Sequence, residues 1–168
     1  MRTPSGPPAD PPSDLSDPAP DGGVWRFTTP ALDSSVPETR HAVRALLDRQ
    51  RIPVARDIRD GLLLIVSELV TNAVRHAALL SPTVAVEVAV KGDWVRVAVE
   101  DEHPYRPKAL EATEHDLGGR GLWLVKMVAE EAGGTCDVER TASGGKAVWA
   151  ELPLFPDAAA VTSPPHPR

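Results

Sequence analysis

Residues 68–77 read ELVTNAVRHA and close the segment with the strongest helical pattern in the chain. Apolar side chains recur at three- and four-residue steps through this segment, at Ile58, Leu62, Ile65, Val66, Leu69, Ala73 and Val74. This spacing gathers them on one face and predicts a helix over about residues 55–77. The helix should end before Ser81, because a residue that precedes a proline avoids the helical conformation.

Polar residues occupy another face of the same helix. Glu68, Asn72 and His76 are spaced four residues apart, so each lies one turn from the next, and Arg75 lies nearby. An amide oxygen can bind Mg²⁺ beside phosphate oxygens, and a carboxylate can accept a proton from an attacking hydroxyl. A solvent-facing polar stripe on an amphipathic helix is the alternative interpretation, and the spacing alone does not exclude it.

Two further helices are predicted on either side of this one. The first spans about residues 36–51, where Ser35 and Glu38 fit a capping box at its start. The other begins near Gly121, and the pair of glycines at 133–134 ends it.

Alternating β-branched residues predict the strands. They lie on both sides of a turn at residues 91–93, which indicates a hairpin, and two more strands are expected at about 135–140 and 146–152. The connection 141–145 between the last two is interpreted as a hairpin turn. The predicted order is helix, helix, strand, strand, long loop, helix, strand, strand. Helices on one face of a mixed, mostly antiparallel sheet form a two-layer α/β sandwich.

Composition limits the domain count and the function classes. Of the 168 residues 18 are proline, and they crowd both ends, so residues 1–23 and 156–168 are expected to be disordered tails around one domain at 24–155. The net charge of −6 argues against broad nucleic-acid binding. The sequence has no apolar run long enough for a membrane span and no signal-peptide pattern. A single Cys136 excludes an internal disulfide, so a cytoplasmic location is expected.

Two more features can carry chemistry. Asp101 follows a valine-rich strand, where a carboxylate can accept a hydrogen bond from an exocyclic amine such as that of adenine, although aspartate also initiates turns. Residues 117–122 read LGGRGL and open into a helix. Glycines let the backbone approach a ligand, a helix N-terminus attracts phosphate, and Arg120 adds a cation. The chain has no P-loop motif, and this segment does not fit the Rossmann fingerprint.

The order of these motifs resembles that of the Bergerat-fold (GHKL) ATPases, which include gyrase B, the histidine kinases and the MutL repair proteins. ELVTNAVRHA, then a strand ending in Asp101, then GGRGLWLV at 118–125, then GGKAVW at 144–149, cover essentially the whole foldable part. The segment 68–77 looks most like the short anti-sigma factor serine kinases, whose helix motif is E-x-x-x-N-A-x-x-H. The resemblance implies the Bergerat ATP-binding fold and ATP with Mg²⁺ as cofactors.

The resemblance also implies roles for individual residues. Asn72 would hold Mg²⁺ against the phosphates, and Glu68 would orient or deprotonate the acceptor hydroxyl. Asp101 would receive the adenine amine. The remaining nucleotide-binding residues would be Arg75, His76, Gly119, Arg120, Gly121 and Leu122. The implied activity is transfer of the ATP γ-phosphate to a serine or threonine of an antagonist protein. The implied partners are a sigma factor, an anti-anti-sigma protein of the STAS type, or both, and a homodimer is a further possibility.

Two departures from the family pattern keep a second function open. The family follows its adenine-binding aspartate with D-x-G-x-G, whereas residues 101–104 read DEHP. The family also carries a threonine after the glycine of its last motif, whereas Lys146-Ala147 stands there in this chain. Both changes predict weaker ATP binding. The alternative is a binding module that sequesters a sigma factor or another regulator without catalysis. A histidine-kinase fragment with His41 as phosphoacceptor is disfavoured, because the residues around His41 lack the acceptor motif.

Overall fold

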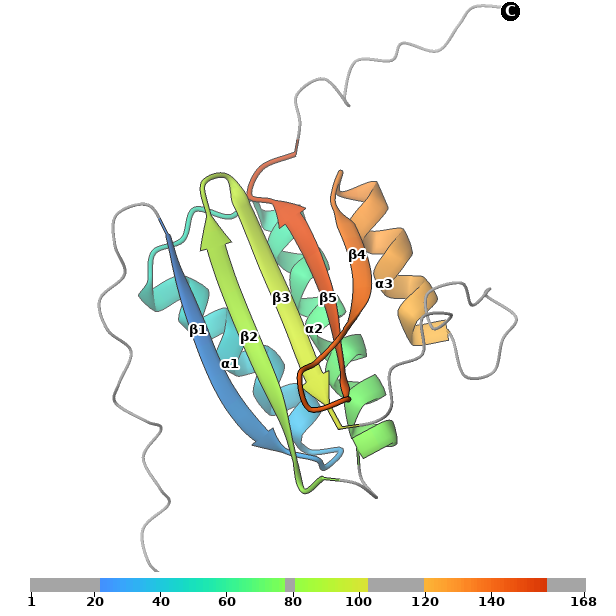
Figure 1. Cartoon of the computed structure of the whole chain (residues 1–168). Coiled ribbons are helices and arrows are strands. Elements are labelled where there is room, and N and C mark those ends of the chain that lie inside the picture. The colour runs from blue at the N-terminus through green and yellow to red at the C-terminus, as the bar shows by residue number, and fades with distance from the viewer. Residues whose placement is uncertain (1–21, 78–80, 103–119, 157–168) are drawn as a thin grey trace, which may run out of the picture.

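The computed structural model describes residues 22–77, 81–102 and 120–156. Five strands form one open sheet in the order β1-β2-β3-β5-β4 (Figure 1). Their bounds are β1 Gly22–Pro30, β2 Thr83–Lys91, β3 Trp94–Asp101, β4 Thr135–Arg140 and β5 Lys146–Pro153. Every pairing between these described strands is antiparallel.

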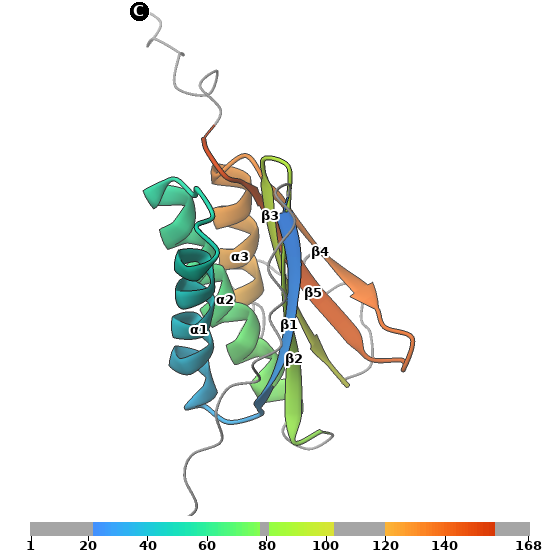
Figure 2. The ribbon, with the colours of Figure 1, turned by 90° about the vertical axis from the view of Figure 1, so that its left-hand side faces the viewer.

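Three helices cover one face of the sheet and leave the other face open, as Figure 2 shows. They are α1 Ser35–Arg49, α2 Arg56–Ala77 and α3 Arg120–Glu131. The long α2 lies between the other two and contacts both of them as well as β3 and β5. The two-layer α/β prediction is therefore confirmed.

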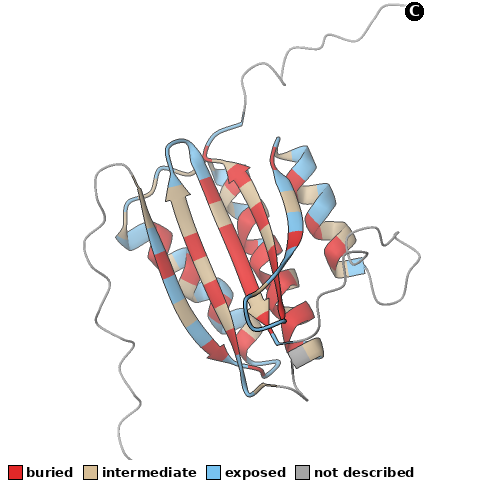
Figure 3. Cartoon of the chain, in the orientation of Figure 1, coloured by how far each residue is buried: buried red, intermediate tan, exposed pale blue. Residues whose placement is uncertain are grey.

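The core lies between the helices and the sheet (Figure 3). Leu62, Ile65 and Leu69 of α2 are fully buried against inward-facing valines such as Val86 and Val97 of the central strands. Burying a side chain of this size contributes roughly 1.5–3 kcal/mol. The apolar stripe read from the sequence of α2 is thus the face that fixes this helix on the sheet.

The first strand was missing from the predicted order. In β1, Trp25, Phe27 and Thr29 turn toward the helices while the residues between them face outward, and the strand begins at Gly22, two residues before the expected boundary. It pairs along its whole length with β2. This alternation is short and follows a proline-rich segment, which hid it in the sequence.

The predicted capping box at the start of α1 was wrong. Ser34 is the N-cap residue, it makes no side-chain cap bond, and its backbone is already helical. Ser35 lies inside the helix, its N–H donates to the Leu32 carbonyl, and its buried hydroxyl has no hydrogen-bond partner among the described residues. A tight turn over residues 31–34 therefore satisfies the backbone in place of a side-chain cap.

The other predicted elements lie within one or two residues of their expected bounds. Gly92, with φ of 55°, makes the turn of the β2–β3 hairpin. The described chain enters at Gly22 beside Lys91 and leaves beyond Pro153, which pairs with Trp94. Both ends of the described domain therefore lie at the β2–β3 turn.

Candidate functional site

Four chain segments meet at the opposite end of the sheet, on the side of the helices. They are the last turns of α2, the end of β3, the start of α3 and the start of β5 (Figure 1). Each segment carries residues singled out in the sequence. The topology thus brings together motifs that are separated by up to 78 residues, from Glu68 to Lys146.

Asp101 and Lys146 form the interior of this end. Asp101 is the last residue of β3 and Lys146 the first of β5, and the two are direct partners across the sheet. Both are buried, with 5% and 3% of their surface exposed. Lys146 Nζ lies 3.9 Å from Asp101 Oδ2, so the two side chains form a buried ion pair between neighbouring strands.

His76 joins this pair from α2. Its Nδ1 lies 2.7 Å from Lys146 Nζ. An ammonium group can only donate, so Nδ1 of His76 is the acceptor in this contact. A carboxylate, an ammonium and an imidazole therefore follow one another from β3 through β5 to α2.

Gly145 allows this arrangement. A Cβ atom at this position would collide with the carbonyl oxygen of Asp101. The turn before it is closed by two backbone bonds, Gly144 N–H to Thr141 O at 3.0 Å and Thr141 N–H to Gly145 O at 3.1 Å. The hairpin-turn interpretation of residues 141–145 is confirmed, and the turn also delivers Lys146 to the site.

Asn72 and Glu68 lie one and two turns below His76 on α2. Asn72 is 9% exposed, and its Nδ2 has no hydrogen-bond partner among the described residues. Leaving a buried polar group unsatisfied costs about 1–3 kcal/mol. A bound ligand that pairs with this carboxamide would remove that cost, so Asn72 fits the role of a ligand-binding residue.

Glu68 is half-buried and faces the N-terminus of α3. A Cβ at Gly121 would approach to 2.8 Å of Glu68 Oε2, so the glycine makes room for the carboxylate. The first turn of a helix carries positive partial charge, which favours an anionic group there. The structure thus brings the ELVTNAVRHA helix and the glycine–arginine segment into contact at this carboxylate.

The remaining predicted residues differ in their position. Arg120 is exposed at the first position of α3, and Arg75 is exposed near the end of α2. Leu122 is buried in the apolar core cluster, so its side chain serves packing, and its backbone is the part of the residue that can donate to a nucleotide. Gly119 lies outside the described residues. Sequence reasoning treated Lys146 only as a departure from the family pattern, and its place opposite Asp101 in the strand register is the signal that identifies it.

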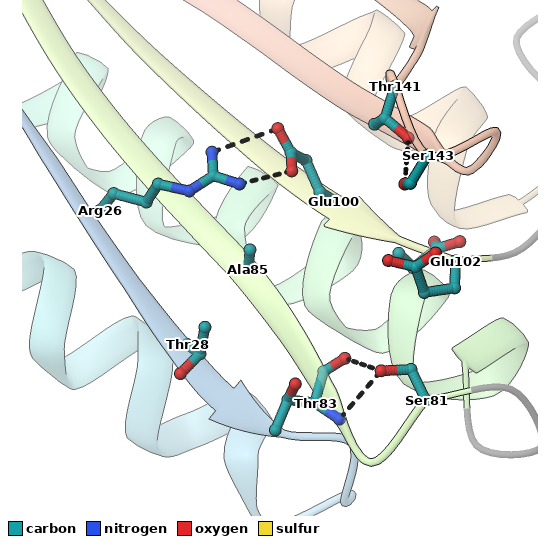
Figure 4. Close-up of a pocket in the computed structure, with 10 residues that line it drawn as sticks. Arg26, Thr28, Ser81, Thr83, Ala85, Glu100, Glu102, Thr141 and Ser143 are labelled. Atoms are coloured by element: carbon teal, nitrogen blue, oxygen red, sulfur yellow. Dashed lines mark hydrogen bonds and ion pairs between the residues drawn. The ribbon is translucent and has the colours of Figure 1, made fainter.

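A pocket of about 150 Å³ lies on the open face of the sheet at the same end, and Asp101 belongs to its lining. Figure 4 shows hydroxyl groups around it, and the ion pair between Arg26 and Glu100 crosses its edge at 2.5 Å. The hydrogen bond that Arg26 donates to Glu100 is the main cause that raises the pKa of Arg26 above its ordinary value. Within the described ranges, no three metal-binding acidic, histidine or cysteine side chains gather.

The sequence matches the family model of the histidine kinase-like ATPase domain over residues 29–152. The chain belongs to this family. The match spans all three helices and strands β2 to β5, with only the last two residues of β1. The suspected Bergerat-fold relationship is therefore confirmed, and membership implies that the domain binds ATP. A comparison with curated proteins gave no match.

Among solved structures, the RsbU and RsbW domains of Rv1364c from Mycobacterium tuberculosis are similar in fold, with a TM-score of 0.57 and 19% identity over 78% of this chain. The chain spans only 32% of that protein. The histidine kinase domain of a blue-light activated kinase from Erythrobacter litoralis EL346 matches with a TM-score of 0.48 and 22% identity, over 74% of this chain and 61% of the kinase chain. None of the helices in the described part of the chain is long and apolar enough to cross a membrane.

Proposed function

We propose that this ATPase domain is a regulator of the anti-sigma factor type that transfers the γ-phosphate of ATP to a serine or threonine of an antagonist protein. The family match supports the ATP-binding part of the proposal. The single observation that carries the kinase part is the half-buried Glu68, held against the N-terminus of α3 and one turn from Asn72, whose amide Nδ2 has no partner among the described residues. The partners proposed are a sigma factor and a STAS-type antagonist, and the setting proposed is the cytoplasm.

In this proposal the end of α2 and the start of α3 bind the triphosphate. Asn72 is the residue that would hold Mg²⁺, and the ion, when bound, supplies positive charge to the phosphate oxygens. The N-terminus of α3 presents the backbone N–H groups of Gly121 and Leu122, which have no acceptor within the helix itself, and Arg120 adds its guanidinium. Gly119 would extend this phosphate-binding segment, and Arg75 would reach the phosphates from α2.

Glu68 does the chemical work assigned to the protein. Phosphoryl transfer needs mostly positioning and charge stabilisation, with one carboxylate to orient the attacking hydroxyl and accept its proton. Gly121 leaves space for this carboxylate beside the helix N-terminus. At the other end of the cleft, Asp101 would accept a hydrogen bond from the adenine amine, with His76 behind it.

The test is Glu68→Gln in the full chain, incubated with γ-labelled ATP, Mg²⁺ and purified STAS-type proteins of the same host. We expect ATP binding to stay within about threefold and transfer to fall by about 10²–10⁴-fold, the usual contribution of a positioned acid or base. Asp60→Asn, on the exposed part of α2, is the matched control and should transfer normally. The label should survive acid, as phosphoserine and phosphothreonine do and phosphohistidine does not.

Normal transfer by Glu68→Gln would exclude Glu68 as the catalytic carboxylate. The second candidate function is a non-catalytic module that sequesters a sigma factor or another regulator. The observation that favours it is the Lys146–Asp101 ion pair, which already engages the carboxylate proposed for adenine. Titration calorimetry of the full chain with ATP and Mg²⁺ separates the two, because no heat at millimolar nucleotide leaves only the sequestering role.

A further inference from the structure

Lys146 is the charged side chain at this site that the proposed reaction does not use. Its ammonium is 3% exposed and lies between Asp101 and His76. Removing an ammonium from water costs several kcal/mol, which a partner only partly offsets, and apolar residues of similar volume often stabilise a fold as well or better. Stability alone therefore does not explain a lysine at this position.

The distances around Lys146 are unequal. The contact with His76 Nδ1, at 2.7 Å, is a full hydrogen bond. The separation of 3.9 Å from Asp101 Oδ2 exceeds the range of about 2.7–3.2 Å for an N–H···O bond. His76 therefore helps to hold the ammonium in place, and Nζ of Lys146 lies beside Oδ2 of Asp101 at a distance longer than a hydrogen bond.

A carboxylate beside an ammonium presents an acceptor next to a donor. The Watson–Crick edge of adenine presents the complementary pair, because the N6 amine donates and the adjacent N1 accepts. Asp101 and Lys146 extend from paired strand positions toward the helices, so both belong to one layer of the site. Asp101, the residue proposed to bind the adenine amine, is nearly as buried as Lys146. The low exposure of Lys146 is therefore no stronger an argument against a base contact than that of Asp101.

We propose that Lys146 recognises adenine directly, by donating a hydrogen bond to N1 while Asp101 accepts from the N6 amine. This inference rests on the proposed binding of ATP at this end of the sheet. Lys146 is then a specificity-determining residue, and His76 is a positioning residue that holds the ammonium in place. The lysine thus gives the domain a second base contact beside Asp101.

A purely structural Lys146 would neutralise Asp101 and make no contact with N1. Replacing a single atom of the base distinguishes the two roles. In 1-deaza-ATP the N1 acceptor is a C–H group, whereas 3-deaza-ATP keeps N1 and changes the opposite edge. The probes are therefore ATP, 1-deaza-ATP and 3-deaza-ATP, titrated with Mg²⁺ into the full chain by calorimetry.

For the wild type we expect 1-deaza-ATP to bind about 10-fold or more weakly than ATP, as for the loss of a hydrogen bond to a charged group, and 3-deaza-ATP to bind within about threefold. In Lys146→Met the ratio between ATP and 1-deaza-ATP should fall to about threefold or less. Lys126→Met, an exposed lysine of α3, is the matched control and should keep the wild-type ratio. The comparison of ratios isolates the contact between Lys146 and N1 from other effects of the substitution.

His76 supplies an independent readout. His76→Gln keeps a hydrogen-bond acceptor for the ammonium and should retain most of the ratio, whereas His76→Leu should lower it. If Lys146→Met does not fold, Lys146→Leu, which also lacks a hydrogen-bond donor, replaces it in the same titrations, with the same expected ratio.

The outcomes separate the two proposals. A wild type that binds ATP and 1-deaza-ATP equally overturns the role of Lys146 and leaves ATP binding intact. The same ratio in Lys146→Met as in the wild type also overturns it, because another group then recognises N1. A wild type that binds no ATP overturns the proposed function and this inference with it.

Discussion

The two faces of the sheet hold ion pairs in opposite environments. On the helix-covered face, Asp101 and Lys146 are nearly excluded from water and His76 completes their contacts. On the open face, Arg26 pairs with Glu100 and Glu87, and all three side chains remain at least one-third exposed.

A second open-face group shows the same pattern. Arg96 lies 3.4 Å from Glu139 and stacks over the ring of Trp149, with its guanidinium carbon 4.1 Å from the ring centroid. Exposed pairs of this kind stabilise a fold by about 0–1 kcal/mol, because water competes for each charge. Buried charges depend on their partners far more strongly. Acidic and basic side chains therefore pair on both faces of the sheet, and burial decides which pairs are candidates for function.

The largest expected effect comes from breaking the buried pair. Asp101→Ala leaves the Lys146 ammonium without its carboxylate, and we expect the free energy of unfolding to fall by about 3–5 kcal/mol. Urea denaturation followed by tryptophan fluorescence measures it. The double variant Asp101→Ala/Lys146→Met should recover part of the loss, because no charge is then left unpaired. If Asp101→Ala lowered the free energy of unfolding by less than about 1 kcal/mol, the buried pair would stabilise the fold no more than an exposed pair does.

A smaller effect, on transfer rather than stability, is expected at Gly121. In Gly121→Ala the new Cβ would come within 2.8 Å of Glu68 Oε2, the tip of a flexible side chain, so the carboxylate must move while the fold remains. Displacing a catalytic group by about 1 Å can cost up to about 10²-fold in rate. We expect at least a tenfold loss in the labelled-ATP assay, with the unfolding free energy within about 1 kcal/mol of the wild type.

Gly61→Ala is the control for Gly121→Ala. Its Cβ would lie 3.2 Å from Val128 Cγ1, between α2 and α3 but away from Glu68. Its transfer rate should stay within about twofold of the wild type. If both alanine variants lose transfer equally, helix packing and not the position of Glu68 explains the loss.

The smallest effect is expected on the open face. Arg26→Met removes the bonds to Glu100 and Glu87 at an exposed site, so we expect a loss of at most about 1 kcal/mol, and less at 1 M salt. The measurement is the urea midpoint at low and high salt. A loss as large as that of Asp101→Ala would remove the distinction between the faces.

The spacing of apolar residues predicted the helices and strands that carry a clear hydrophobic pattern within their own sequence. The stripe from Ile58 to Val74 defined α2, and the alternating valines defined β2 and β3. Strand β1 was not predicted, because its inward residues Trp25 and Phe27 form too short a pattern to indicate a strand until the pairing with β2 is known. The start of α1 was misassigned because backbone carbonyls of the preceding turn accept the first N–H groups of the helix. A pattern of side chains in the sequence does not indicate such backbone hydrogen bonds.

The same limit applies to the site. Glu68, Asn72 and His76 share a helix face, so their spacing was enough to group them. Lys146 is 45 residues from Asp101 and 70 from His76, so its contacts depend on the strand register and on the packing of α2. Long-range contacts of this kind cannot be read from local spacing, although a resemblance to a family can indicate the position.

Both ends of the described domain lie beside the β2–β3 turn, a full strand length from the proposed nucleotide site. Any sequence attached before Gly22 or after Pro156 starts from the distal side. A fluorescent label, an affinity tag or a neighbouring domain joined there lies away from the proposed nucleotide site. The architecture therefore suits attachment to a neighbouring domain and immobilisation on a sensor surface through either end.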